Sequence, residues 1–343
     1  MKNYSVDKCH EMIMQARKPL LAYDESCDYE NWRGQVKAKL LELLGDMPER
    51  ADLNLQIEWE QEYDTFKEYR LVFCSEEYVF VPCHLWIPKK ANKPCPVVLC
   101  LQGHSTGMHI SMGRFVYEGD EELASNGDRD FAKQIVQEGY AALVVEQRGF
   151  GERKSERELK IRPDAGCTCA HPALVAMLMG RTLLGERVWD ISRAIDVLEN
   201  FPEIDMERVA VMGNSGGGTA TYYAACLDER IKVAMPSCSV CTYKRSITAK
   251  KHCACNYIPG AAKYFDMGEL SCLIAPRKLI VVAGEQDNGF FIDGVRDAYA
   301  TVEKVYEKAG AARNCQFVVG SEGHRFYAEQ SWPAFKALSG WIM

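Results

Sequence analysis

Six short apolar runs in the last two thirds of the chain constrain its fold most strongly. They are "VVLCLQ" (97–102), "AALVVEQ" (141–147), "VAVMGN" (209–214), "VAMPSCS" (233–239), "KLIVVAG" (278–284) and "CQFVVG" (315–320). Segments long enough for helices separate most of these runs. Short, continuous apolar runs are typical of strands that are buried on both faces. Their alternation with helices predicts a three-layer α/β fold with a mostly parallel central sheet.

The beginning of the chain follows a different pattern. Residues 36–50, "VKAKLLELLGDMPER", place apolar side chains at helical spacing before a glycine and a proline. Residues 55–63 and 69–89 instead alternate apolar and polar side chains, which is typical of half-buried antiparallel strands. We therefore expect an N-terminal helical extension over residues 1–50, followed by one α/β domain over residues 51–343.

A cluster of glycines surrounds one serine at the end of the third run. Gly213-Asn214-Ser215-Gly216-Gly217 fits the pattern G-x-S-x-G, with an apolar run before it and a helix-length segment after it. In such a strand-to-helix turn the serine hydroxyl projects above the sheet, and small neighbours relieve the steric clash. A phosphate-binding turn and simple tight packing are the alternatives. The flanking strand and helix favour Ser215 as a nucleophile.

A nucleophilic serine needs a base, and the base needs an acid that orients it. In sheets with this turn the chain order is serine, acid, histidine. Asp287 follows the fifth run, and His324 follows the sixth. Because parallel strands end at the same edge of a sheet, we expect both side chains to lie beside Ser215. Glu285, which is nearer the strand end, and Asp293 are weaker candidates for the acid.

Acyl transfer also needs hydrogen-bond donors for the negatively charged oxygen. We assign this oxyanion hole to the backbone N–H groups of Gly216 and His104, with Gly103 as the alternative second donor. Gln102, Gly103 and Asn214 are predicted to contact substrate. The His104 side chain either faces substrate or is present only for its backbone, and the sequence leaves both interpretations open.

Two longer segments are expected to form the walls of the substrate pocket. The loop over residues 101–130 is unusually long for a strand-to-helix connection, and such loops are often functional. It is predicted to supply His109, Arg114 and Tyr117 to one wall. Residues 241–270 are predicted to form a cap that supplies the other.

Two short segments combine cysteine with histidine: Cys167-Thr-Cys169-Ala-His171 and His252-Cys253-Ala-Cys255. Thiolates and imidazoles are the usual ligands of zinc, so an alternative interpretation is that each segment supplies half of one zinc site. The C-x-C spacing differs from the common C-x₂₋₄-C of structural zinc sites, and the chain has fifteen cysteines. We therefore interpret these residues as packing near the active site and predict no metal.

Charge and cysteine content limit which binding partners and which cellular compartment we expect for the protein. A formal net charge of −7 argues against nucleic acid or an anionic membrane as the main partner. The first residues lack the apolar stretch of a signal peptide, and the odd number of scattered cysteines indicates reduced thiols. We expect a cytoplasmic protein. Since no G-x-G-x-x-G or P-loop pattern follows the runs, we expect no nucleotide cofactor.

The serine turn, the order Ser215, Asp287, His324 and the series of strands resemble the α/β-hydrolase superfamily. Over about residues 70–340, segments such as "EQRGFGER", "VMGNSGGGTATYYAA", "HCACNYIPG" and "LIVVAGEQD" are similar to its bacterial acetyl xylan esterase-like and dienelactone-hydrolase-like branch. The resemblance implies a cofactor-free serine carboxylesterase. Its expected substrates are small or oligosaccharide esters, such as acetyl esters of carbohydrates.

Two alternatives to an esterase remain open. The same triad cleaves amides, so a peptidase or acylaminoacyl hydrolase is one. The other is a catalytically silent binding protein that keeps the fold. The N-terminal helices are also a candidate interface for a homo-oligomer.

Overall fold

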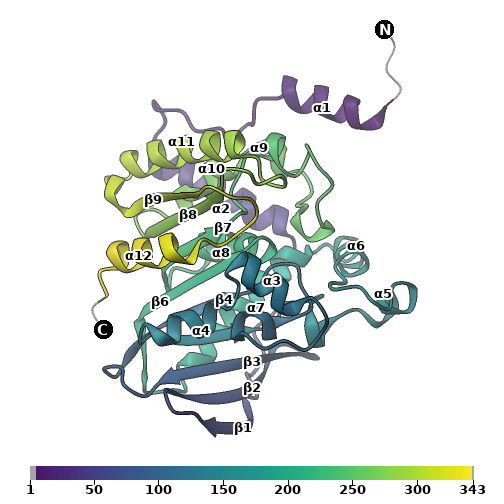
Figure 1. The fold of residues 1–343 in the computed structure, drawn as a ribbon. Helices are drawn as coiled ribbons and strands as arrows, with labels where there is room; N and C mark the ends of the chain where they lie inside the picture. Colours follow the sequence, from purple (N-terminus) through teal and green to yellow (C-terminus); the bar gives the residue numbers. More distant parts are fainter. Residues whose placement is uncertain (1–4, 342–343) are drawn as a thin grey trace.

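Within residues 5–341, the part of the chain that the computed structural model describes, nine strands form one mixed sheet (Figure 1). The strand order is β1-β2-β3-β5-β4-β6-β7-β8-β9. The strands are β1 (Gln56–Glu62), β2 (Phe66–Glu76), β3 (Val79–Pro88), β4 (Cys95–Leu101), β5 (Ala141–Val145), β6 (Ile204–Asn214), β7 (Ile231–Ser237), β8 (Lys278–Gly284) and β9 (Cys315–Gly320). Neighbours from β1 to β3 and on to β5 are antiparallel, and those from β5 to β9 are parallel. The predicted mostly parallel sheet is confirmed, and the six apolar runs are β4 to β9.

Helices cover both faces of this sheet. Side chains of α2 (Tyr29–Leu44), α7 (Leu183–Leu198), α8 (Gly216–Leu227) and α11 (Ile292–Lys308) contribute to the larger core on one face. Those of α4 (Phe131–Gln137) and α12 (Ala328–Ser339) contribute to the core on the other face. The remaining helices are α1 (Val6–Ala16), α3 (Asp120–Gly127), α5 (Glu156–Ile161), α6 (Ala170–Leu178), α9 (Ala261–Tyr264) and α10 (Met267–Leu270). The three-layer architecture predicted from the sequence is therefore present.

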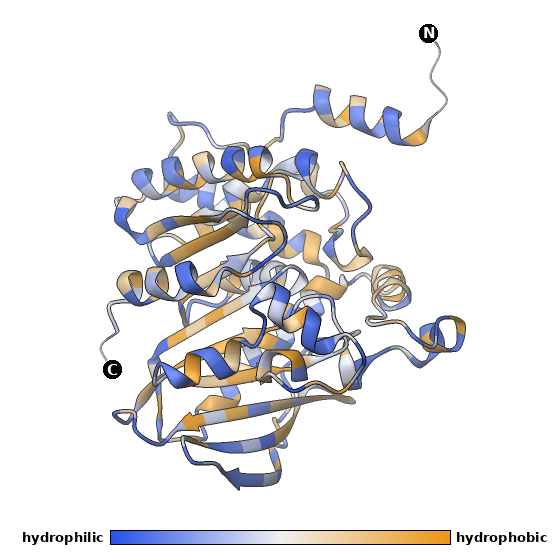
Figure 2. Cartoon of the chain, in the orientation of Figure 1, coloured by the Kyte–Doolittle hydropathy of each residue, from blue (hydrophilic) through white to orange (hydrophobic). Residues whose placement is uncertain are grey.

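The central strand β4 shows why its sequence is apolar throughout. Val97, Leu99 and Leu101 lie in the larger core, whereas Val98 and Cys100 lie in the core on the opposite face. Successive side chains of a strand point to opposite faces, so a strand covered on both sides needs an apolar residue at every position. By contrast, the edge strand β1 is exposed along its length and mostly hydrophilic (Figure 2).

The first fifty residues contain the expected helices, but the two helices pack differently. None of the side chains of α1 is buried. In α2, Trp32, Val36, Leu40 and Leu44 are buried in the same core as the central strands. The second helix is therefore part of the packing of the main body of the protein.

The segment before β6, one of the helix-length segments between the apolar runs, forms two helices. Gly180, with a φ of 79°, separates α6 from α7, and the Thr182 hydroxyl caps the start of α7 by accepting the Gly185 N–H at 3.0 Å. Within residues 5–341, no helix is both long enough and apolar enough to cross a membrane.

Candidate active site

Ser215 occupies the sharp turn between β6 and α8. Its φ of 58° and ψ of −122° lie in a region that residues with a Cβ rarely adopt. The Ser215 N–H donates to the Ser237 carbonyl oxygen at 2.8 Å, which ties the turn to the neighbouring strand β7. The sequence pattern predicted this strained turn, and the backbone confirms it.

The glycine at position 217 is required by close packing. A Cβ built on Gly217 would lie 2.1 Å from the Leu101 carbonyl oxygen and 2.6 Å from that of Gln102. A Cβ on Gly213 would lie 2.5 Å from the Gly217 carbonyl carbon. These glycines let α8 begin directly against the end of β4, and this brings Ser215 beside the loop that follows β4.

The predicted base and acid are hydrogen-bonded to each other. His324 Nδ1 lies 2.7 Å from Asp287 Oδ2. The other carboxylate oxygen accepts the N–H groups of Gly289 at 2.8 Å and Phe290 at 3.2 Å. Burial raises the pKa of Asp287, but the hydrogen bonds and the charge of His324 outweigh it, and the pKa is lowered overall. Asp287 is thus held as a carboxylate that orients the imidazole.

The alternative acids have other partners. The Glu285 carboxylate accepts two hydrogen bonds from Arg296, at 2.9 and 3.0 Å. Asp293 is paired with Arg245. Neither carboxylate is bonded to His324 in the described part of the chain, so the geometry favours Asp287.

A bidentate ion pair positions the loop that carries His324. Arg325 donates to both carboxylate oxygens of Asp128, each at 2.8 Å. The Phe326 N–H also donates to the Gly127 carbonyl oxygen at 3.1 Å. These contacts join the His324 loop to the end of α3. Among the described residues, no hydrogen bond joins Ser215 to His324, so their catalytic contact stays a prediction.

The two predicted oxyanion residues flank Ser215. Gly216 is the first residue of α8. The His104 imidazole lies so close to it that a Cβ on Gly216 would be 2.7 Å from His104 Cε1. A Cβ on Gly103 would be 2.8 Å from the Asn214 carbonyl oxygen and 3.1 Å from Ser215 Cβ. The loop after β4 therefore passes directly beside the serine, although the direction of its N–H groups toward an oxyanion stays a prediction.

Glu146 and Gln147, which the sequence analysis missed, hold this loop. The Gln102 side chain donates to Glu146 at 2.6 Å, and the Gln147 side chain donates to the Gln102 carbonyl oxygen at 2.7 Å. Burial raises the pKa of Glu146 to about 7 despite the N–H groups of Met108 and Glu152. Both residues directly follow β5, and polar side chains at the end of a buried strand were the available signal.

The predicted substrate contacts of Gln102 and Asn214 do not fit the positions of their side chains. Both side chains are buried. Gln102 is bonded to Glu146, and Asn214 donates to Ser237 Oγ at 3.1 Å. The structure thus directs these amides into the protein, where they support the turn and the loop.

The loop after β4 lines a hollow beside His324, but Ser215 and the three predicted wall residues lie outside its lining, so the wall of the substrate pocket stays a prediction. His109 is bonded to Asp120, and Arg114 is paired with Glu68, while neither lines a hollow next to His324. A hollow of about 320 Å³ instead lies between α3, Arg129 and His324. Tyr117 also lies outside its lining.

The cap segment also reaches the active site. His252 Nε2 lies 3.0 Å from the Gly289 carbonyl oxygen, beside the acid loop. The Phe290 ring lies between His252 and His324, at 5.0 and 6.2 Å from them. The residues after β7 therefore contact the loop that carries Asp287.

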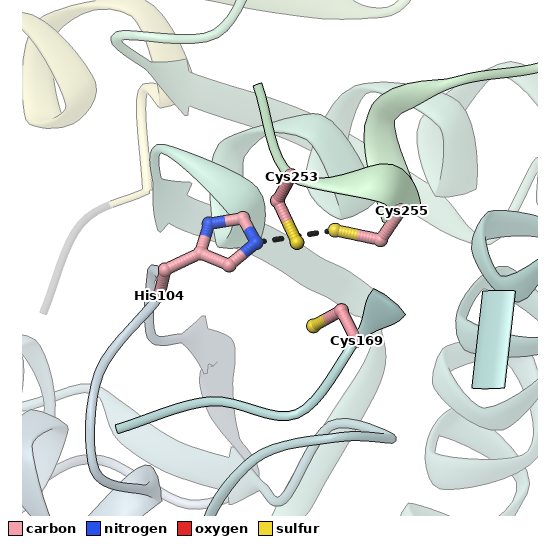
Figure 3. A group of neighbouring side chains, drawn as sticks. All are labelled: His104, Cys169, Cys253 and Cys255. Carbon is pink, nitrogen blue, oxygen red and sulfur yellow. Dashed lines mark hydrogen bonds between the residues drawn. The ribbon is translucent and has the colours of Figure 1, made fainter. Parts of the chain in front are cut away.

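Three cysteines of the two cysteine and histidine segments lie close together. The histidine beside them is His104, which the sequence analysis did not pair with these cysteines. The potential ligand atoms of His104, Cys169, Cys253 and Cys255 all lie within 4.8 Å of one another (Figure 3). His171 and His252 lie outside this group. The cysteines also pack in a small apolar cluster, as the packing interpretation expected. A second group, Cys238 with Asp287 and His324, contains the candidate acid and base.

Comparison with known proteins agrees with this architecture. YtaP from Bacillus subtilis (strain 168), a proposed hydrolase, is 27% identical over 314 residues, which are 90% of this chain and 100% of YtaP. A proposed acetyl xylan esterase from Bacteroides fragilis superposes with a TM-score of 0.81 and 16% identity, covering 98% of this chain and 96% of that one. A glucuronoyl esterase from Solibacter usitatus gives a TM-score of 0.70 and 19% identity, covering 95% and 97%.

At these identities the two solved structures establish the fold alone. Residues 4–317 match the model of the Abhydrolase family. The match spans the Ser215 turn, the Asp287 loop and most of the sheet. The chain therefore belongs to the Abhydrolase family, and it has the α/β-hydrolase fold that its sequence predicted.

Proposed function

We propose that the protein is a serine carboxylesterase acting on carbohydrate esters. The observation that carries the proposal is the pair of His324 and Asp287, 2.7 Å apart, at the edge of the sheet where the strained turn presents Ser215. A serine in such a turn, a histidine and a buried carboxylate are the parts that acyl transfer needs.

In the proposed reaction, Ser215 Oγ attacks the ester carbonyl carbon while His324 accepts its proton. The tetrahedral oxyanion accepts hydrogen bonds from the N–H groups of Gly216 and His104. His324 then donates its proton to the leaving alcohol. Water, deprotonated by His324, hydrolyses the acyl-enzyme and releases Ser215. Throughout, Asp287 stabilises the imidazolium form of His324.

Arg129 supports an oxygen-rich substrate. Its side chain lines the hollow beside His324, and its Nε atom is buried with no hydrogen-bond partner in the described residues. Burial lowers the pKa of Arg129 despite the nearby Cys238. A buried N–H group without a partner is costly, and a carbonyl, hydroxyl or carboxylate oxygen of a substrate would satisfy it.

The names of several structural neighbours, which are acetyl xylan or glucuronoyl esterases, point the same way. Both names describe esters of carbohydrates. We therefore propose that the substrate is a sugar that carries an acyl group or a uronic acid ester.

The test compares substrates on wild-type protein and on Ser215→Ala. The panel contains p-nitrophenyl acetate, acetylated xylo-oligosaccharides, a methyl ester of glucuronic acid and aminoacyl anilides. We expect ester hydrolysis with sugar esters preferred, and a loss of about 10³-fold or more in Ser215→Ala. Preference for anilides would indicate a peptidase, and inactivity of the folded protein on all four would indicate a binding protein.

Arg129→Met tests the assigned substrate contact. Loss of a charge-assisted hydrogen bond of about 2 kcal/mol corresponds to a rise in KM of about 30-fold. Arg313→Met, in a short turn before β9, is the matched control. Equal KM values for Arg129→Met and wild type would remove Arg129 from the proposed site.

A further inference from the structure

Four potential metal ligands meet beside the nucleophile turn, and they come from three separate segments (Figure 3). His104 lies in the loop after β4, Cys169 precedes α6, and Cys253 and Cys255 belong to the cap segment after β7. His104 Nε2 and Cys255 Sγ are 3.1 Å apart. All four donor atoms lie within 4.8 Å of one another.

We propose that His104, Cys169, Cys253 and Cys255 bind one Zn²⁺ ion in a closed, tetrahedral site. Three cysteines and one histidine are an established ligand set of structural zinc. With Zn–S bonds of about 2.3 Å and a Zn–N bond of about 2.0 Å, donor atoms of a regular site are about 3.5–3.8 Å apart. The farthest atoms therefore need to close by about 1 Å, and His104 Nε2 and Cys255 Sγ, at 3.1 Å, need to open by about 0.4 Å. Three soft thiolates favour Zn²⁺ over Mg²⁺ or Ca²⁺, which prefer oxygen ligands.

The charge of Arg187 provides an independent argument. Its side chain is 1% exposed, and its Nη2 atom donates to Cys169 Sγ at 3.1 Å. Arg187 also donates to the Arg148 carbonyl oxygen, at 2.6 and 3.1 Å, but it has no ion pair with an acid in residues 5–341. Arg187 Cζ also lies 4.4 Å from the centroid of the Phe150 ring, but this contact does not neutralise the charge, and a buried cation without an anionic partner is strongly unfavourable.

A zinc site would supply the missing negative charge. Three thiolates and one neutral imidazole around Zn²⁺ carry a net charge of −1, which balances the Arg187 guanidinium. Neutral thiols would leave this cation unpaired, and so would a disulfide between two of the cysteines. All of the cysteines are unbridged in the described structure.

The ion would act by positioning. With four protein ligands the site has no open position for water or substrate, which is typical of structural zinc. It would join the loop after β4 to α6 and to the cap, with the His104 imidazole held against Gly216. The zinc site stands independently of the proposed esterase function. Only its effect on turnover, through the His104 N–H, rests on that function.

The first measurement is the metal content of untagged protein, purified under reducing conditions without chelators. We expect about one zinc ion per chain by inductively coupled plasma mass spectrometry. The Cys169→Ser and Cys255→Ser proteins should each contain less than about a tenth of the zinc per chain found in wild type. Cys315→Ser, at the start of β9, and Cys167→Ser, beside the group but outside it, should keep full content.

A second measurement does not depend on the folding of variants. Wild-type protein is stripped with a chelator and titrated with Co²⁺ and then Zn²⁺. We expect saturation at one Co²⁺ per chain, with the absorption bands of tetrahedral thiolate-bound cobalt, and loss of these bands when Zn²⁺ replaces it.

Several results would overturn the proposal. They are no stoichiometric uptake of either metal by reduced protein, full zinc content in Cys169→Ser and Cys255→Ser, or loss of zinc in Cys167→Ser. None of these results depends on esterase activity, so the failure of one proposal is distinguishable from the failure of the other.

Discussion

Replacing Asp287 by asparagine tests the mechanism through a single charge. The Asp287 side chain is 1% exposed, and its carboxylate lies 2.7 Å from His324 Nδ1. At an effective dielectric constant of about 20, attraction between the carboxylate and the imidazolium at this distance is about 6 kcal/mol. The His324 side chain is 31% exposed, so solvent screens part of this energy and we expect about 3 kcal/mol in the transition state.

This energy corresponds to a fall of about 10²-fold in kcat/KM for Asp287→Asn. The assay is the steady-state hydrolysis of p-nitrophenyl acetate near pH 7. Because the charge acts only after His324 gains its proton, kcat should fall with little change in KM. Glu285→Gln is the control, since this carboxylate is paired with Arg296. An Asp287→Asn enzyme within threefold of wild type, or an equal loss in Glu285→Gln, would refute the assigned roles.

Three further predictions concern stability, measured by urea unfolding. Between pH 4.5 and 8, the free energy of unfolding of wild type should fall by about 3 kcal/mol relative to that of Glu146→Gln. Burial raises the folded-state pKa of Glu146 to about 7, so the stability that the protonated form provides is lost as the pH rises. Parallel pH profiles of the two proteins would contradict this. Gly217→Ala should lower the free energy of unfolding by about 3 kcal/mol or more, because its Cβ would lie 2.1 Å from a carbonyl oxygen. Gly34 in α2 has open space around it, so Gly34→Ala should leave the free energy of unfolding unchanged or raise it. Leu40→Ala should lower the free energy of unfolding by about 2–5 kcal/mol, and Leu41→Ala should lower it much less because the Leu41 side chain is 38% exposed. Equal losses would show that α2 is not packed as described.

The sheet was the most predictable part of the molecule. The strands from β4 to β8 contribute side chains to the cores on both faces, so their sequences must be apolar at consecutive positions and the signal is local, whereas the edge strand β9 is mostly half-buried. The Ser215 turn was equally local, because a serine at a φ of 58° requires small neighbours. Both features are written into a few adjacent residues.

Side-chain direction was less predictable. Gln102 and Asn214 lie at the right places in the chain, yet their amides are bonded to Glu146 and Ser237 inside the protein. Position after a strand indicates that a residue is near the site. It does not determine which way the side chain turns, because this depends on partners far away in the sequence.

The convergence of His104 with the three cysteines was the hardest to foresee. The sequence analysis paired cysteines with their neighbours His171 and His252, whereas the histidine in the group comes from the loop after β4. The three segments follow β5, β4 and β7, and they meet because these strands lie close together in the sheet, in the order β5-β4-β6-β7. Such a juxtaposition is a property of topology, which short motifs do not encode.

The central claim is that His324 activates Ser215 for attack on an acyl group. Covalent labelling with a fluorophosphonate probe, followed by intact mass and peptide mapping, tests it most directly. We predict one adduct per chain on Ser215 in wild-type protein, and a loss of at least about 10²-fold in labelling rate in His324→Ala. Folded wild-type protein that gains no adduct, or that labels equally fast without His324, would contradict the account.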